Sequence, residues 1–173
     1  MEELRSIPAP LVVVFERIDS DEGEFRREFD SLSEATDDPL SQWLKLAKAR
    51  GETKESDPVV LTLLVELHRK VDALTREIEG GESDLLVLPA KGRITGINYE
   101  HFILEDPLLD AGSRYYGRID LPAFPQREVP LFFNASEPTV GHLELMHERD
   151  RKDWNSYVAS RERAMIREMK GLQ

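Results

Sequence analysis

The chain has 173 residues, enough for one ordinary domain or a small domain with an appendage, and its formal net charge is −11. Because nucleic-acid binding needs a basic surface, this charge argues against a general DNA- or RNA-binding protein, although one or two arginines suffice for a small anionic messenger. The absence of cysteine excludes disulfides, thiol nucleophiles and cysteine-ligated metals. The acidic start and the short apolar runs predict a cytoplasmic protein without a membrane-spanning segment.

The N-terminal part is predicted to be one strand followed by helices. Residues 11–15, which read LVVVF, are β-branched and apolar and therefore favour a strand, and Pro8 and Pro10 favour an extended entry to it. This strand either joins the edge of a sheet or caps the helices, and the sequence leaves both placements open. Residues 21–36 and 39–49 carry apolar side chains at helical spacing, and a polar connector follows at 51–57.

A longer helix at 58–79 has the most regular pattern in the chain. Ser56 or Asp57 before Pro58 is a helix-start signal, and Gly80-Gly81 is a stop signal. Alternating spacings of four and three residues form an a/d heptad seam made of Val60, Leu64, Leu67, Val71, Leu74 and Ile78. The seam predicts self-association of the chain, with packing inside the monomer as the alternative. Further apolar residues widen the face beyond a two-stranded seam and favour a higher-order bundle, namely Leu61, Leu63 and Val65.

The C-terminal half, from residue 84, is predicted to be a small β-barrel or sandwich with a terminal helix. Residues 84–104 read as strand, turn and strand, with turns near Pro89–Gly92 and Gly96. Three further strands are predicted within 113–122, 127–135 and 139–148, each bounded by Gly, Pro, Asn or Ser. The chain becomes helical again from Arg149 to Lys170.

No catalytic or metal-binding motif stands out. The histidines are His68, His101, His142 and His147, and none has the spacing to a second histidine or carboxylate that is typical of a metal site. The many carboxylates cluster in exposed runs, and no phosphate-binding loop or nucleophile motif occurs. We therefore expect a protein that is not an enzyme and has no metal or cofactor.

The last ninety or so residues resemble a PilZ domain. In residues 93–122 the features are a turn and strand, a leucine and glycine turn at Leu109 and Gly112, and a strand ending in Leu121-Pro122. Residues 140–168 resemble the last PilZ strand and its helix. The resemblance implies a PilZ-like barrel, and some atypical PilZ proteins with added heptad helices form helix-bundle tetramers.

The motifs with which PilZ domains bind cyclic di-GMP are absent from the expected places. Lys91 and Arg93 precede the expected barrel but are two residues apart, whereas the R-x-x-x-R motif needs four. Arg163 and Arg167 have the correct spacing but lie in the terminal helix. The D/N-x-S-x-x-G motif should fall near residues 93–99, which contain no serine. The resemblance thus implies a PilZ-like fold without its usual ligand site.

The sequence as a whole predicts an α+β protein: a small antiparallel PilZ-like barrel with a C-terminal helix and an N-terminal helical segment. We expect three regions, at 1–57, 58–80 and 81–173, with self-association through the middle one, as a tetramer more than a dimer. The expected function is a protein-binding adaptor in bacterial cyclic di-GMP-linked signalling, such as pilus or flagellar motility and virulence. The alternative is a cyclic di-GMP receptor with a non-standard site formed by Lys91 and Arg93, with Arg114 or Arg118.

Overall fold

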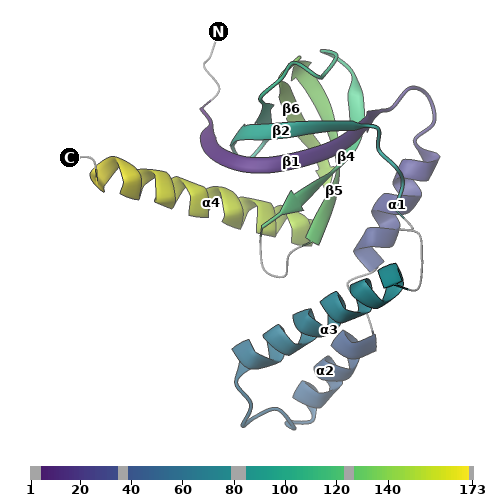
Figure 1. Ribbon diagram of the computed structural model, residues 1–173, viewed down its shortest axis with the longest axis vertical. Coiled ribbons are helices and arrows are strands. Elements are labelled where there is room, and N and C mark those ends of the chain that lie inside the picture. Colours follow the sequence, from purple (N-terminus) through teal and green to yellow (C-terminus); the bar gives the residue numbers. More distant parts are fainter. Residues whose placement is uncertain (1–4, 35–38, 79–84, 123–126, 172–173) are drawn as a thin grey trace. The chain divides into compact units, whose positions relative to one another are not determined.

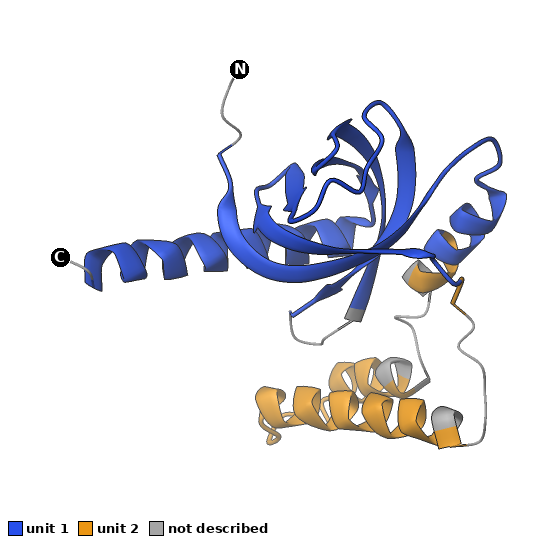
Figure 2. Ribbon diagram, turned by 45° about the horizontal axis from the view of Figure 1, so that its top comes forward, with its two compact units in different colours: residues 1–29, 87–173 blue, residues 30–86 orange. Residues whose placement is uncertain are grey.

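The computed structural model describes residues 5–34, 39–78, 85–122 and 127–171. It combines helices with a closed antiparallel barrel and a C-terminal helix, so the predicted α+β class is confirmed at this level. The chain forms two compact units, residues 1–29 together with 87–173, and residues 30–86 (Figure 2).

In the described part of the chain, six strands close the barrel in the order β1-β2-β3-β6-β5-β4 (Figure 1). The strands are β1 Ile7–Arg17, β2 Ala90–Ile97, β3 His101–Leu104, β4 Arg114–Leu121, β5 Arg127–Glu137 and β6 Val140–Met146. Side chains alternate between the barrel interior and its outer face, as expected for strands. The interior is filled by large apolar side chains, among them Phe15, Ile94, Phe102, Ile119, Leu131 and Phe133. The barrel is therefore a packed core.

Strand β1 is part of the barrel, which decides the placement that the sequence left open. It pairs with β2 on one side and with β4 on the other. Pro8 and Pro10 lie inside β1, on its exposed face, and the pairing register shifts between Pro8 and Leu11. Such an irregularity accommodates residues that have no N–H to donate. Because β1 belongs to the barrel, the barrel unit combines residues 1–29 with residues 87–173.

The β2–β3 hairpin corrects the predicted turn positions. Residues 85–89 form no strand, and β2 runs through the predicted turns at Pro89–Gly92 and Gly96. The turn lies instead at 98–100, where Asn98 Oδ1 accepts the backbone N–H of His101 at 2.6 Å. The Asn98 backbone N–H donates to the His101 carbonyl at 2.9 Å. An asparagine side chain that bonds the backbone ahead of it builds a turn without glycine.

Helix α4 Glu148–Gly171 packs against the barrel as far as Met165, whereas its C-terminal end extends past the barrel (Figure 1). Trp154 and Val158 are buried in the barrel core. The Trp154 Nε1–H donates to the Asn98 carbonyl at 3.1 Å, and Arg161 Nε donates to the Pro8 carbonyl at 3.0 Å. These bonds fix the helix to β1 and to the β2–β3 turn.

Helix α1 Gly23–Glu34 begins in the barrel unit and covers part of the outer face of β4 and β5. Phe25 stacks on Tyr116 with ring centroids 5.2 Å apart, and Phe29 packs on Phe132 at 5.4 Å. Tyr116 and Phe132 are fully buried even though they point away from the barrel interior. The start of α1 therefore completes a second, smaller apolar core outside the barrel.

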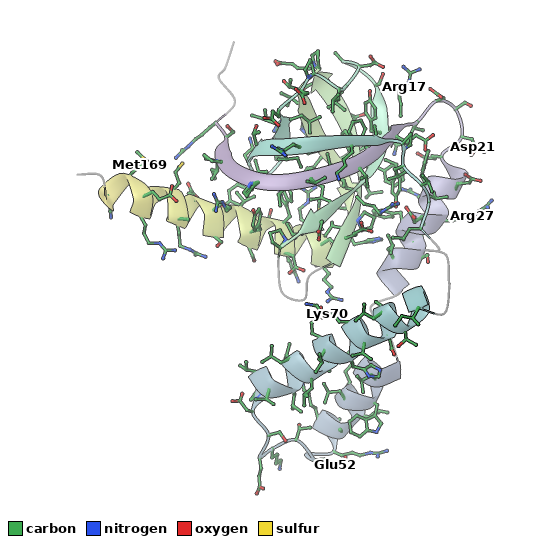
Figure 3. All side chains as sticks on the ribbon, viewed as in Figure 1. Arg17, Asp21, Arg27, Glu52, Lys70 and Met169 are labelled. Atoms are coloured by element: carbon green, nitrogen blue, oxygen red, sulfur yellow. The ribbon has the colours of Figure 1, made fainter. Side chains whose placement is uncertain are left out.

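Residues 30–86 contain helices α2 Pro39–Ala49 and α3 Pro58–Ile78, which lie side by side as a helical hairpin (Figures 1 and 2). Gly51 adopts a φ of 76° and donates its N–H to the Lys48 carbonyl at 3.1 Å, which ends α2. Figure 3 labels Glu52 in the connecting loop and Lys70 on α3. The sequence predicted both helices and their polar connector.

Candidate functional site

The N-terminus of helix α3 is built by a local capping interaction. Asp57 Oδ1 accepts the N–H of Val59 at 2.9 Å, and the Asp57 carbonyl accepts the N–H of Leu61 at 3.1 Å. Pro58, which has no N–H, occupies the first helical position, where none is needed. Of the two residues that the sequence left open, Ser56 and Asp57, it is Asp57 that caps the helix. The predicted stop at Gly80-Gly81 lies outside the described residues.

Helix α2 lies beside α3 (Figures 1 and 2). On α2, Ala47 is buried and Leu44 is half-buried, and on α3 the half-buried apolar residues are Leu61 and Val65. Each residue advances a helix by about 100°, so Leu61 and Val65 point roughly 100–140° away from the line through Val60 and its seam partners. Helix α2 therefore leaves the seam uncovered.

The predicted seam is exposed along its whole described length. Val60, Leu64, Leu67, Val71, Leu74 and Ile78 are between 49% and 84% exposed. Val59 and Leu63 are also exposed and extend the apolar surface on one flank. An exposed apolar surface of this kind is typical of an interaction site. We call these six seam residues, with Val59 and Leu63, the α3 surface.

Charged residues border the α3 surface. His68 Nε2 lies 3.2 Å from Asp72 Oδ2, one turn further along the helix. Glu66 is buried although it is charged, and its carboxylate lies 4.0 Å from Arg69 Nη1. These pairs place polar side chains beside the apolar residues of α3.

The basic residues proposed for a non-standard dinucleotide site lie on the outside of the barrel. Lys91 and Arg93 are on exposed positions of β2. Arg93 Nη1 lies 3.7 Å from Glu105 Oε2, an exposed pair. A carboxylate beside an exposed arginine competes with an anionic ligand for the guanidinium.

The two β4 arginines are held by carboxylates. Arg114 donates from Nε to Glu144 at 2.8 Å and from Nη1 to Glu22, and these bonds raise the pKa of the Arg114 guanidinium, the Glu144 bond most. Arg118 is buried and donates from Nη1 to Glu28 Oε2 at 2.7 Å. Neither arginine faces an open anion site.

The structure brings together two histidines that the sequence separates. His101 on β3 is directly opposite His142 on β6, and the two ring centroids are 4.4 Å apart. Partial burial, followed by the repulsion from His142, lowers the pKa of His101. His147 lies apart from this pair, with Nε2 2.7 Å from the Phe29 carbonyl. The His101–His142 pair could not be predicted from the sequence, because cross-strand register depends on the whole sheet.

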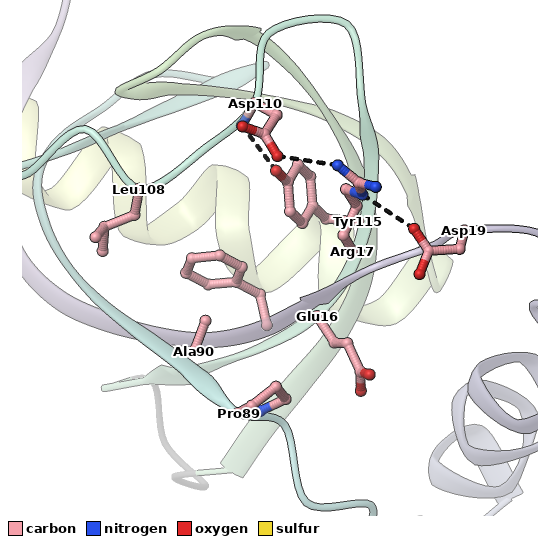
Figure 4. A pocket seen from close by; sticks show the side chains of 9 residues that line it. Glu16, Arg17, Asp19, Pro89, Ala90, Leu108, Asp110 and Tyr115 are labelled. Atoms are coloured by element: carbon pink, nitrogen blue, oxygen red, sulfur yellow. Dashed lines mark hydrogen bonds and ion pairs between the residues drawn. The ribbon is translucent and has the colours of Figure 1, made fainter.

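A shallow pocket of about 360 Å³ opens at one end of the barrel (Figure 4). Phe15 and Tyr115 form its apolar wall, and the backbone N–H of Asp110 donates to the Tyr115 hydroxyl at 2.8 Å. Arg17 donates to Asp19 at 3.0 Å and to Asp110 at 3.1 Å, which raises the pKa of its guanidinium. Since two carboxylates neutralise Arg17, the pocket has no excess positive charge to attract a phosphate.

No protein-family model matches the chain, and no curated protein or solved structure matches it either. Across residues 5–34, 39–78, 85–122 and 127–171, no helix has the length and apolar character needed to cross a membrane. In the same ranges, no group of three or more His, Asp or Glu side chains is arranged to hold a metal ion. The case for function therefore depends on the α3 surface and on the geometry of the barrel.

Proposed function

We propose that this protein is a non-enzymatic adaptor that self-associates through helix α3 and uses a PilZ-like barrel to bind a protein partner in bacterial cyclic di-GMP-linked signalling. The observation that carries the self-association is the α3 surface, in which all six seam residues are exposed while α2 packs on another side of the helix. The adaptor role and the signalling context come from the resemblance to PilZ domains.

The α3 surface has enough apolar area to support a stable assembly. Fully burying an aliphatic side chain contributes about 1.5–3 kcal/mol, so covering the exposed half or more of six such side chains contributes roughly 5–10 kcal/mol per chain before entropy costs. Helix α3 has 21 residues, about three heptads, which is marginal for an isolated two-stranded coil. The extra flank of Val59 and Leu63 widens the surface and favours a four-helix arrangement over a dimer.

The PilZ-like interpretation is supported by the closed six-stranded barrel and by the helix that follows its last strand. If the fold is PilZ-like, the first barrel strand is β1, and an R-x-x-x-R motif should stand before Ile7. Residues 1–6 contain one arginine, Arg5. The second motif should lie at the β2–β3 turn, where Asn98 is followed two residues later by Glu100 instead of serine. Residues 1–6 and 98–103 therefore contain neither motif in complete form.

The alternative function, a cyclic di-GMP receptor with a non-standard site, has less support. Of the four residues it would use, Arg114 and Arg118 are bonded to carboxylates and Arg93 lies beside Glu105. A dinucleotide would have to displace these partners, at a cost in binding free energy. Calorimetric titration with cyclic di-GMP should give no saturable heat. Micromolar binding that Arg93→Ala abolishes would instead establish the receptor.

The self-association is tested by the mass of the particle in solution. Light scattering or sedimentation equilibrium should give a multiple of the 19.9 kDa chain mass. Leu67→Glu places a charge in the middle of the α3 surface and should dissociate the particle while the β-sheet signal in circular dichroism remains.

Ala73→Glu is the matched control, because it adds the same charge to the same helix at an exposed position well off the seam. It should leave the mass unchanged. A monomeric wild-type protein, or equal dissociation by both substitutions, would rule out assembly through the α3 surface. Unfolding by Leu67→Glu would show that the seam belongs to the core of the monomer.

A further inference from the structure

The His101–His142 pair has a geometry suited to a shared metal ion. The two residues are Cα partners on adjacent antiparallel strands, and their side chains lie on the outer face of the barrel. Their ring centroids are 4.4 Å apart, with the ring planes at 75°. A metal ion bound at about 2.0–2.1 Å by one nitrogen of each imidazole, at a near-tetrahedral angle, places the ring centres roughly 5 Å apart. The centroid separation is thus close to that of a metal-bridged pair, and turning the rings from their edge-to-face arrangement so that one nitrogen of each faces a common point admits an ion.

The tautomer of His142 is also suitable for binding a metal ion. Its Nδ1 lies 3.0 Å from the Leu143 carbonyl oxygen, and a carbonyl can only accept, so Nδ1 carries the hydrogen. In the neutral ring, Nε2 then has its lone pair available for a metal. Metal-binding histidines usually donate their other ring N–H to a carbonyl or carboxylate in this way, which fixes the ring orientation. The Leu143 carbonyl provides this support before any ion binds.

The charges around the His101–His142 pair favour the binding of a cation. Asn134 on β5 faces His142 on the side opposite His101, and Asn134 donates to Glu144. The nearest guanidinium across the sheet, Arg114, is bonded to Glu144 and Glu22. The chain as a whole carries a net charge of −11, which raises the local concentration of cations.

We propose that His101 and His142 bind one divalent transition-metal ion on the outer face of the barrel. Imidazole ligands suit zinc, copper and nickel, whereas the short supply of oxygen ligands at this pair disfavours magnesium and calcium. Two protein ligands leave two positions for water or for a side chain of a bound partner. The site is therefore open, unlike a closed four-ligand structural site.

Titration of the full-length protein with zinc chloride, followed by calorimetry, tests the site. We expect saturable binding of one ion per chain, lost in His101→Asn and in His142→Asn. His68→Asn is the matched control. His68 is an exposed histidine on helix α3, outside the barrel, beside the Asp72 carboxylate of the same helix, and it should bind no stoichiometric ion. It should leave the binding unchanged. Both barrel substitutions are on the outer face, so circular dichroism should be unaltered.

A second measurement uses the wild-type protein alone. The imidazole proton resonances of His101 and His142 should shift together during the zinc titration, while those of His68 and His147 stay in place. Absence of saturable binding, binding that persists in His142→Asn, or binding that only His68→Asn removes would each overturn the proposal. Shifts confined to His68 would identify an adventitious ion only, which also overturns it.

Discussion

Glu28 Oε2 lies 2.7 Å from Arg118 Nη1, and the two side chains are only 6% and 7% exposed. The Tyr116 hydroxyl donates to the same carboxylate oxygen at 2.6 Å. Glu28 is on α1, whereas Arg118 and Tyr116 are on β4. The buried ion pair therefore joins the first helix to the outer face of the barrel, beside the aromatic contacts of Phe25 and Phe29.

Removing the negative charge of this pair should destabilise the barrel unit strongly. Glu28→Gln leaves the Arg118 guanidinium buried without its main counter-charge, and breaking one partner of a buried pair costs about 3–5 kcal/mol. Urea unfolding at neutral pH, followed by circular dichroism, measures the change in the free energy of unfolding.

Glu28→Leu combined with Arg118→Met provides the control, because replacing both charges with apolar groups removes the uncompensated charge. The double variant should recover most of the stability lost in Glu28→Gln. If the single substitution changes the free energy of unfolding by less than about 1 kcal/mol, the pair is solvated and the buried geometry is wrong.

Tyr116 should remain protonated in the folded protein at alkaline pH. Burial, and then the hydrogen bond to Glu28, raise its pKa far above the ordinary value of 10.0. Above pH 10 the unfolded chain loses this proton whereas the folded chain keeps it, so the free energy of unfolding falls as the pH rises. Ultraviolet titration of tyrosinate should show Tyr116 ionising only when the protein unfolds.

Tyr116→Phe isolates this contribution. The variant keeps the ring and its stacking on Phe25 but has no proton to lose, so its stability should fall less steeply above pH 10 than that of the wild type. Equal slopes for the two proteins would show that Tyr116 titrates normally in the folded state.

The two tryptophans should differ sharply in their effect on stability. Trp154 is 1% exposed and joins α4 to the barrel, whereas Trp43 on α2 is 62% exposed. Trp154→Ala should lower the free energy of unfolding by about 3–5 kcal/mol, because it leaves a large cavity and an unpaired Asn98 carbonyl. Trp43→Ala should change the free energy of unfolding of the barrel little. In the wild-type protein, iodide should quench the fluorescence of Trp43 but not that of Trp154.

Gly141 on β6 should not tolerate a methyl group. A Cβ at this position would lie 2.3 Å from Cζ of Phe102, a ring that is fully buried in the barrel. Gly141→Ala should therefore destabilise the barrel by about 1–3 kcal/mol through overpacking, as measured by thermal or urea unfolding. Gly171→Ala, where no atom lies within 4 Å, is the control and should leave the stability close to that of the wild type.

The elements that depend on local patterns were predictable. Pro39–Ala49 and Pro58–Ile78 form helices as their apolar spacing and their proline and capping signals indicate. Arg114–Leu121 and Arg127–Glu137 form strands within a residue or two of the predicted limits. These elements could be predicted because the apolar spacing and the capping residues that define them lie within or next to each element in the sequence.

The β2–β3 hairpin could not be predicted in the same way. Glycine at 92 and 96 suggested turns, but both residues lie in β2, and Asn98 makes the turn through its side chain. At Gly96 a Cβ would lie 3.1 Å from the Ser6 side chain, so the glycine permits close packing within the sheet. Whether a glycine serves a turn or a close approach depends on its neighbours in space.

By itself the sequence determined the α+β class, the main helices, the late strands and the heptad spacing of Val60 to Ile78, because these depend on periodicity along the chain. The tertiary structure alone decided that β1 closes the barrel, that His101 faces His142 and that α2 packs beside the seam instead of on it. Each of these depends on contacts between residues far apart in the sequence. Strand register and helix packing select such contacts only when the whole fold forms.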